Sequence, residues 1–203
     1  MFFSEEYKIM WWQPPRIASR ALSCIPKTLN FDDQKNGHTL TVVNKEWDVF
    51  HPTRNPYSRT VSWWNLRYNE IIEDGPKITY LNFEQFVKMD NNEYFRIESG
   101  HTWDVVSTLK SNNMQAKYVV RYEHLIDDLM KLDFIKDNFE ILKNNLYDLK
   151  YTTRNSYRNR YSDITKNPIC SFYTQELADI VWQEKQYEFE EWGYERDSWK
   201  TLL

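Results

Sequence analysis

The segment VFHPTRNPYSRTVSWWNLR, residues 49–67, joins an apolar run to a proline-containing turn and then to a helix-like stretch. We expect Arg54, Arg59 and Ser62 to lie close together where a strand ends and a helix begins. Unpaired backbone N–H groups and the helix dipole favour negative charge at such a place. Arginine adds a planar fork of donors suited to phosphate or sulfate. The segment therefore predicts an anion site; the alternative is a surface loop, broken by prolines, that carries unrelated arginines.

The composition is that of a folded protein. A chain of 203 residues can bury a sizeable core, since domains typically hold about 100 to 200 residues, and we expect one domain over residues 1–203. Aromatic residues make up 17% of the chain and only four residues are glycine, which argues against disorder. The net charge of -4 does not favour a general polyanion-binding surface. We therefore expect no nucleic-acid partner, and any nucleotide site must be local.

Cysteine content and hydropathy bear on the compartment. Cys24 and Cys170 are too few for a disulfide framework or a four-thiolate metal site, so we expect free thiols in a reducing, cytoplasmic environment. The N-terminal sequence MFFSEEYKIMWW has acids before its apolar run and no basic flank, which predicts a strand and not a signal peptide. No run approaches the roughly 18 apolar residues that span a bilayer, so we expect no membrane partner.

A second anion-binding element is predicted near the N-terminus. Residues 7–12 form a short apolar run, Pro14 and Pro15 follow, and residues 16–29 have the apolar spacing of a helix. A strand, a tight loop and a helix in this order form a phosphate cradle. The Walker sequence G-x-x-x-x-G-K-[ST] is absent, and no carboxylate for Mg²⁺ is evident. Both absences argue against the alternative of a phosphoryl-transfer protein with a degenerate P-loop.

The remaining pattern predicts alternating strands and helices. Strands are expected at residues 38–43 and 117–121, helices at residues 56–72, 127–149 and 174–192, and a loop at residues 31–37. This order predicts a three-layer α/β sandwich with a mainly parallel central sheet, in which ligands bind at the carboxyl ends of the strands. Asn82 is a candidate N-cap. Trp63 and Trp64 have two interpretations, a platform for an adenine or sugar ring and part of the core.

The string R-N-P-Y-S-R-T-V-S, residues 54–62, resembles the 3′-phosphate-binding motif of the sulfotransferase family. Members of this family have a P-loop-like fold and use 3′-phosphoadenosine 5′-phosphosulfate (PAPS) as the sulfuryl donor. The resemblance implies that Arg54 and Ser62 hold the 3′-phosphate, with Arg59 beside them. It implies no metal.

The string P-P-R-I-A-S-R-A-L, residues 14–22, resembles the family's 5′-phosphosulfate loop. By that resemblance the donor-binding residues of the loop are Arg16, Ile17, Ala18, Ser19 and Arg20. Arg16 stands where many members have Lys, and Ala18 where Gly is usual. These two departures support an alternative from another class, a non-catalytic module that keeps the fold and binds a nucleotide or a sulfated ligand.

The sequence from Gly37 to residue 68 is similar to that of uronyl 2-O-sulfotransferases, in which a Gly-His pair precedes the arginine motif. In those relatives the histidine is the proposed general base, which implies this role for His38. Histidine, with a pKa of about 6.5, can take a proton from a hydroxyl at neutral pH. The alternative for His38 is a structural hydrogen bond at the end of a strand. Three other residues could act as the base: His51, Glu98 and His101.

Two later segments extend the resemblance to about residues 8–194. Glu123 falls in a strand-to-helix junction where the family's acid is structural, and Glu188 stands where Asp is common in a closing motif. Residues 151–166 are polar and basic, and we expect either a lid over the donor's phosphates, with Arg154 as a ligand, or a solvated loop. The sequence thus predicts a PAPS-dependent sulfotransferase that acts on a hydroxyl acceptor, in particular a carbohydrate.

Overall fold

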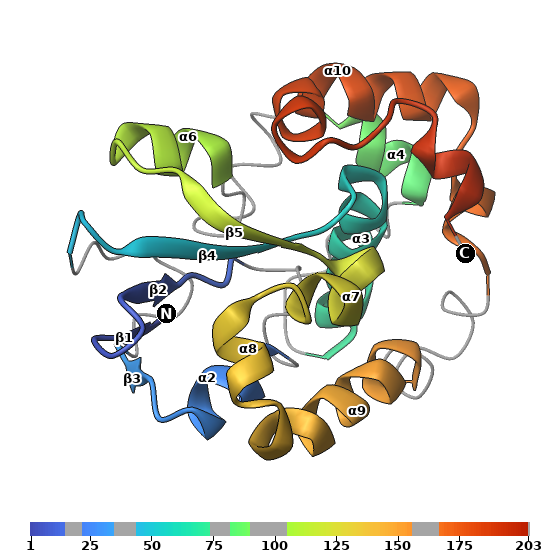
Figure 1. Cartoon of the computed structure of the whole chain (residues 1–203). Coiled ribbons are helices and arrows are strands. Elements are labelled where there is room, and N and C mark those ends of the chain that lie inside the picture. The colour runs from blue at the N-terminus through green and yellow to red at the C-terminus, as the bar shows by residue number, and fades with distance from the viewer. Residues whose placement is uncertain (15–21, 35–43, 74–81, 90–104, 156–166, 203) are drawn as a thin grey trace. The chain divides into compact units, whose positions relative to one another are not determined.

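The computed structural model describes residues 1–14, 22–34, 44–73, 82–89, 105–155 and 167–202 (Figure 1). The chain divides into two compact units that are interleaved in sequence. Unit 1 comprises Met1–Arg54 and Trp103–Ser156, and unit 2 comprises Asn55–Thr102 and Tyr157–Leu203. One boundary between the units therefore falls inside the arginine motif, directly after Arg54.

Unit 1 is built on a five-stranded sheet with the strand order β3-β1-β2-β4-β5. Its strands are β1 (Phe2–Ser4), β2 (Ile9–Trp11), β3 (Asp32–Asp33), β4 (Asp48–Thr53) and β5 (Ala116–Arg121). β4 pairs in parallel with β2 and β5, whereas β1 is antiparallel to both β2 and β3. The sheet is mixed, and the expectation of a mainly parallel sheet is not confirmed.

The antiparallel part comes from an N-terminal hairpin that the sequence did not predict. One strand was expected at residues 7–12, but β1 and β2 pair around a tight turn in which Tyr7 N–H donates to Ser4 Oγ at 3.3 Å. Lys8 takes a positive φ of 54° in this turn, and the sequence has no Gly or Asn there to signal it. β3, expected to be loop, is a two-residue edge strand of exposed aspartates. Backbone pairing alone forms it, so no apolar pattern marks it.

β4 is the central strand of the sheet. Its residues from Val49 to Thr53 are all buried, as expected for a strand with parallel neighbours and helices on both faces. Pro52 is tolerated because the pairing with β2 ends at Phe50, whose carbonyl accepts from Trp12 N–H at 3.0 Å. In β4 the nitrogen of Pro52 faces the same side as the Phe50 carbonyl, which is the side of β2. The paired residues of β2 have ended at this level, so the N–H that Pro52 lacks costs the sheet no hydrogen bond.

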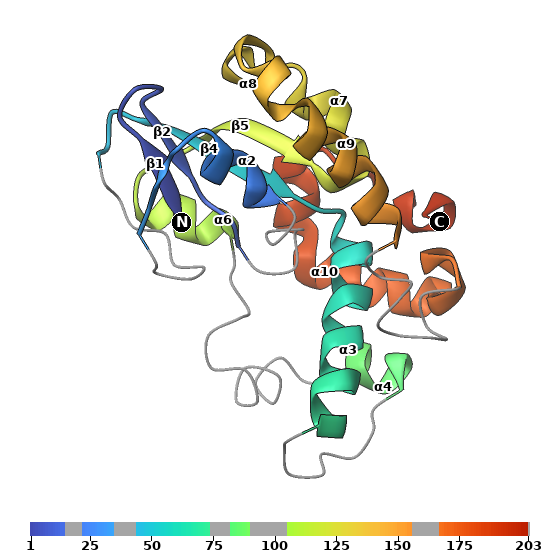
Figure 2. The ribbon, with the colours of Figure 1, turned by 90° about the horizontal axis from the view of Figure 1, so that it is seen from below.

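Helices of unit 1 lie on both sides of the sheet (Figures 1 and 2). On one side are α2 (Cys24–Thr28), α7 (Leu125–Leu129), α8 (Asp133–Asp137) and α9 (Phe139–Asn155), and on the other is α6 (Val105–Ser111). The first side encloses an apolar cluster in which Trp11 stacks on Phe50 with ring centroids 3.8 Å apart. Burial of this cluster stabilises the sheet by removing apolar surface from water.

The single helix expected at residues 127–149 is divided into α7, α8 and α9. Asn138 separates α8 from α9, because its amide donates to the Phe134 carbonyl at 2.8 Å and to the Tyr7 hydroxyl at 3.0 Å. The expectation of a loop or lid beginning at residue 151 is wrong for residues 151–155, which continue α9. No Gly or Pro interrupts these residues, so the sequence allows the helix to continue through them.

A buried carboxylate of α7 ties this helix to the end of β5, and the 3₁₀ turn η1 (Tyr122–His124) joins the two elements. Asp128 is 5% exposed. It accepts hydrogen bonds from Arg121 N, Nε and Nη2 at 3.1, 2.9 and 3.0 Å and from Lys131 Nζ at 2.7 Å. Burial raises the pKa of Asp128, but the hydrogen bonds from Arg121 and Lys131 outweigh burial and hold the pKa well below its usual range. The structural role expected for Glu123 at this junction stays a prediction, and Asp128 adds a second acid that the sequence did not point to.

Asp128→Ala should lower the free energy of unfolding by about 2 to 3 kcal/mol, since hydrogen bonds to a buried charge are lost. Because folding lowers the pKa of Asp128, its contribution is fully present above the unfolded-state pKa of about 3.9 and is lost as the pH falls further. Urea denaturation at neutral and acidic pH measures the difference. Asp133→Ala, which removes a carboxylate 91% exposed in its ion pair with Lys136, is the control. A difference for Asp128→Ala that persists unchanged at strongly acidic pH would contradict this assignment.

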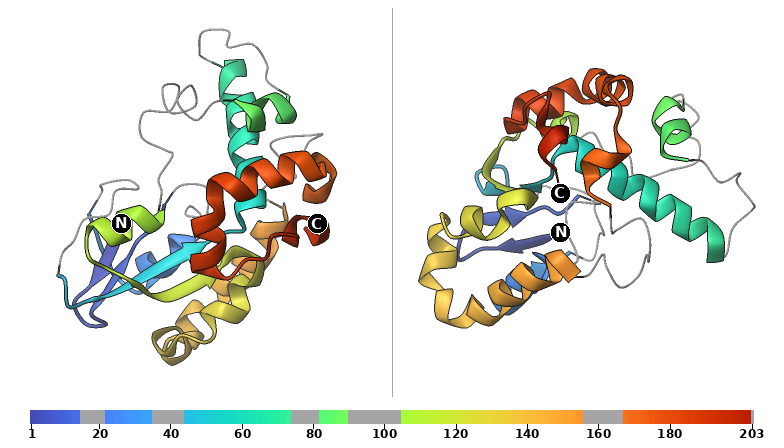
Figure 3. Two further views of the ribbon diagram at one scale, coloured as in Figure 1. Left: turned by 90° about the horizontal axis from the view of Figure 1, so that it is seen from above. Right: turned by 90° about the vertical axis from the view of Figure 1, so that its right-hand side faces the viewer.

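Unit 2 is helical. It contains α3 (Pro56–Glu73), α4 (Phe83–Lys88), η3 (Ile169–Phe172), α10 (Gln175–Trp192) and η4 (Ser198–Thr201). α4 lies beside α3, and α10 contacts both (Figure 3). Their apolar faces form a second cluster that includes Tyr57, Val61, Trp64, Phe83 and Phe189.

The helices of unit 2 follow the sequence closely. α3 and α10 were expected at residues 56–72 and 174–192, within one residue of their observed ends. The predicted cap is confirmed, since Asn82 forms a capping box with Gln85. α10 ends at Gly193, which takes the left-handed φ of 69° and closes the helix as glycine typically does.

Candidate functional site

Arg54 lies at the carboxyl end of β4. Thr53 and Arg121 are the last paired residues of β4 and β5, so Arg54 and Tyr122 follow at the same edge of the sheet. Cζ of Arg54 lies 4.5 Å from the centroid of the Tyr122 ring, and Arg54 is 6% exposed. The carboxyl ends of parallel strands are where α/β sheets bind ligands. The position of Arg54 therefore suits an anion site.

The predicted phosphate loop begins at the same edge of the sheet. β2 runs parallel to β4 and its last residue, Trp11, pairs with Phe50. The chain then passes through the buried residue Gln13 to residues 15–21, which lie outside the described residues. The donor-binding residues expected there remain predictions: Arg16, Ile17, Ala18, Ser19 and Arg20.

In unit 2 the motif continues into the first turns of α3. Asn55 caps this helix, since its Oδ1 accepts from Tyr57 N–H at 3.0 Å and its carbonyl accepts from Arg59 N–H at 2.9 Å. Ser58 and Ser62 are one helical turn apart on one face, and each is 2% exposed. Backbone N–H groups and hydroxyls at a helix N-terminus can hold an anion. Ser62 and Arg54 belong to different units, so their joint contact with one phosphate remains a prediction.

Arg59 is held by a carboxylate within unit 2. Its Nη1 donates to Oε2 of Glu188 at 2.9 Å, and the two side chains are 9% and 3% exposed. The sequence analysis picked out both residues for other reasons, Arg59 as a donor ligand and Glu188 as the acid of the closing motif. The structure joins them, so Arg59 links α3 to α10. A contact between Arg59 and the donor stays a prediction.

Glu188→Ala should lower the free energy of unfolding by about 3 to 5 kcal/mol, because it leaves the buried charge of Arg59 without this partner. The double variant Arg59→Met/Glu188→Leu should recover most of that loss, since it removes both charges and keeps the volume. Chemical denaturation of the single and double variants measures both effects. Glu190→Ala, at an exposed position of the same helix, serves as the control. If the double variant is no more stable than Glu188→Ala, the charge of Arg59 left without Glu188 is not the cause of the loss of stability.

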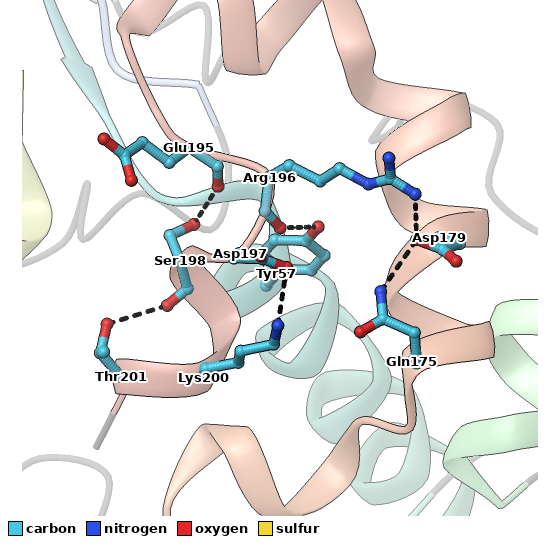
Figure 4. Close-up of polar contacts among 9 residues, drawn as sticks. All are labelled: Tyr57, Gln175, Asp179, Glu195, Arg196, Asp197, Ser198, Lys200 and Thr201. Atoms are coloured by element: carbon cyan, nitrogen blue, oxygen red, sulfur yellow. Dashed lines mark hydrogen bonds and ion pairs between the residues drawn. The ribbon is translucent and has the colours of Figure 1, made fainter.

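The last residues of the chain contact the first turn of α3. Tyr57 Oη donates to the Arg196 carbonyl at 2.6 Å (Figure 4), and Asn55 Nδ2 donates to Ser198 Oγ at 2.8 Å. Arg196 in turn pairs with Asp179 of α10 at 2.6 Å. Burial raises the pKa of Tyr57 to about 12, so its hydroxyl stays protonated and can donate at neutral pH. The sequence analysis missed these contacts, because no local pattern signals them.

The structure describes one of the candidate general bases. His51 is 1% exposed within β4, with its ring centroid 5.4 Å from that of Trp12. His51 is therefore a core residue of the sheet, and the resemblance gave the role of general base to His38. Outside the described residues lie His38, Glu98 and His101. Arg154 lies near the end of α9, and its contact with the donor is not tested.

Trp63 and Trp64 belong to the apolar cluster of unit 2. The ring of Trp64 meets those of Phe83 and Phe172 edge to face, with both centroid separations 5.5 Å. Their interpretation as core residues is confirmed, and these contacts add to the packing energy of the cluster.

Within the described ranges, no helix is long and apolar enough to cross a membrane. The same residues contain no group of three or more His, Cys, Asp or Glu side chains that could hold a metal ion. Cys24 and Cys170 are free thiols, as expected.

An α/β sheet that brings an arginine to the carboxyl edge of its parallel strands, directly before a capped helix in the sequence, has an arrangement that suits an anion ligand. Residues 13–195 match the model of the Sulfotransferase family. This match covers most of the 203 residues, so the chain belongs to the sulfotransferase family and is a transferase of that class. No curated protein and no solved structure matches the chain. The family that the two motifs predicted is confirmed, whereas the uronyl 2-O type is not.

Proposed function

We propose that this protein transfers a sulfuryl group from PAPS to a hydroxyl group of a carbohydrate. The observation that carries the proposal is Arg54, a buried arginine at the carboxyl end of a parallel strand and inside the region that matches the family. The 3′-phosphate is the group that distinguishes PAPS from adenosine 5′-phosphosulfate. An arginine fork at the end of a sheet suits such a phosphate because it offers two parallel donors.

The proposed reaction is an in-line displacement at sulfur. His38 takes the proton of the acceptor hydroxyl, and the acceptor oxygen forms the new bond to sulfur. The bond between sulfur and the phosphate oxygen of the donor breaks, which releases adenosine 3′,5′-bisphosphate. Arg16 and backbone N–H groups of residues 16–20 stabilise the charge that develops on the sulfuryl group and the leaving phosphate. Arg54 and Ser62 hold the 3′-phosphate and so fix the donor for attack.

The proposal extends to the architecture. We place residues 1–203 in one sulfotransferase domain, a three-layer sandwich of the P-loop-like type, and the parallel strands β2, β4 and β5 support this arrangement. A cytoplasmic location remains a prediction from the cysteine content.

Arg54→Ala should weaken the binding of adenosine 3′,5′-bisphosphate by about 10- to 150-fold, the loss of roughly 1.5 to 3 kcal/mol that follows removal of a charged hydrogen bond. The affinity for adenosine 5′-phosphate should change much less, because that ligand has no 3′-phosphate. Arg54→Lys should give an intermediate loss, since lysine keeps the charge but not the fork. Calorimetry with both ligands measures these effects. Equal losses of affinity for the two ligands would show that Arg54 does not bind the 3′-phosphate.

His38→Ala should abolish sulfuryl transfer while it leaves the affinity for adenosine 3′,5′-bisphosphate within a few-fold of wild type, because a general base acts on the acceptor. Transfer assays with labelled PAPS and a panel of oligosaccharides measure the activity. His124→Ala changes an exposed histidine and should retain activity. Near-normal transfer by His38→Ala would move the role to His101 or Glu98. A wild type that binds the bisphosphate but sulfates no acceptor would favour the non-catalytic binding module.

A further inference from the structure

We infer that Tyr122 is a positioning residue for donor recognition, whose ring holds the guanidinium of Arg54 in the orientation that meets the 3′-phosphate. The inference rests on the proposed function and adds a residue to it. The sequence analysis treated the residues around Tyr122 only as a strand-to-helix junction. The contact that assigns the new role lies entirely within unit 1.

The geometry makes Tyr122 the neighbour of Arg54 at the edge of the sheet. The parallel pairing of Thr53 with Arg121 brings the next residue of each strand to the same level. Cζ of Arg54 then lies over the ring at 4.5 Å, within the roughly 6 Å over which a cation is attracted to an aromatic face. Arg54 is 6% exposed, and such an attraction is stronger when the cation is shielded from water.

A contact with a ring face suits an arginine that must bind phosphate. The ring attracts the guanidinium carbon through its π electrons, and this attraction itself uses none of the five N–H donors. An ion pair with a carboxylate would use donors and cancel the charge, as the contact of Arg59 with Glu188 does. The ring also restricts a long side chain before the ligand arrives, which lowers the conformational entropy lost on binding.

Hydrogen bonds fix the backbone on the N-terminal side of Tyr122. Arg121, the residue before Tyr122, gives three hydrogen bonds to the buried carboxylate of Asp128. One of the three comes from the Arg121 backbone N–H at 3.1 Å, so the end of β5 is fixed and not only its side chain. Tyr122 then begins the turn η1. A ring whose backbone is fixed by hydrogen bonds can hold the plane of a guanidinium, whereas a ring on a loop without such bonds could not.

The test compares two affinities in each variant, for adenosine 3′,5′-bisphosphate and for adenosine 5′-phosphate, measured by calorimetry. Tyr122→Leu should reduce the preference for the bisphosphate by about 5- to 30-fold, the range for loss of a shielded cation–π contact. Tyr122→Phe keeps the ring and should retain the preference within about two-fold. In the Arg54→Ala background, Tyr122→Leu should have no further effect on the preference, because it acts through Arg54.

Tyr118→Leu is the matched control, since it removes a nearby tyrosine, in β5, over whose ring Lys117 lies at 5.3 Å. It should lower the melting temperature without a change in the preference. The ratio of the two affinities separates positioning from folding, because a general loss of stability moves both affinities together. If wild type prefers the bisphosphate and Tyr122→Leu retains that preference, the inference is overturned and the proposed function stands. If wild type shows no preference, the proposed function fails and the inference fails with it.

Discussion

The parallel pairing of β4 with β5 is the constraint on which the candidate site depends. The register of this pair shifts by one residue between Val49, which faces Ala116, and Phe50, which faces Tyr118. Without the extra residue in β5, Thr53 would face Val120, and Tyr122 would lie one residue beyond the level of Arg54. β-Bulges of this kind redirect side chains next to functional sites. Here the irregularity brings Tyr122, and not Arg121, level with Arg54.

The arginines of the motif have different electrostatic environments. Arg59 donates to the buried carboxylate of Glu188, so this pair is close to neutral and its main effect is to connect two helices. The ring contact of Arg54 leaves the guanidinium charge in place. Because the ring contact does not neutralise Arg54, whereas the ion pair with Glu188 largely neutralises Arg59, we propose Arg54 as the better candidate of the two for the donor. Their order in the sequence does not reveal this difference.

The sequence predicted what depends on neighbours along the chain. α3 and α10 follow from apolar spacing, and the capping box of Asn82 and Gln85 follows from residue types three positions apart. The failures involve contacts between distant residues or unusual backbone. The hairpin turn uses a lysine at positive φ, for which the sequence has no signal. The role of Asp128 was not predicted, because it reaches back to Arg121 from the next helix and lies outside the junction motif.

The arginine motif is contiguous in sequence, but separate parts of the protein support its two ends. Arg54 meets Tyr122 within unit 1, while Asn55 and Tyr57 are bonded to residues near the C-terminus within unit 2. A peptide with the motif alone would lack both sets of contacts, so ordering its arginine on binding would cost the full conformational entropy. The motif string therefore points to the family, whereas we expect the affinity of the proposed site to depend also on residues that no short pattern contains. The family match reaches from residue 13 to residue 195 and so contains both Arg54 and the ring of Tyr122 over which it lies.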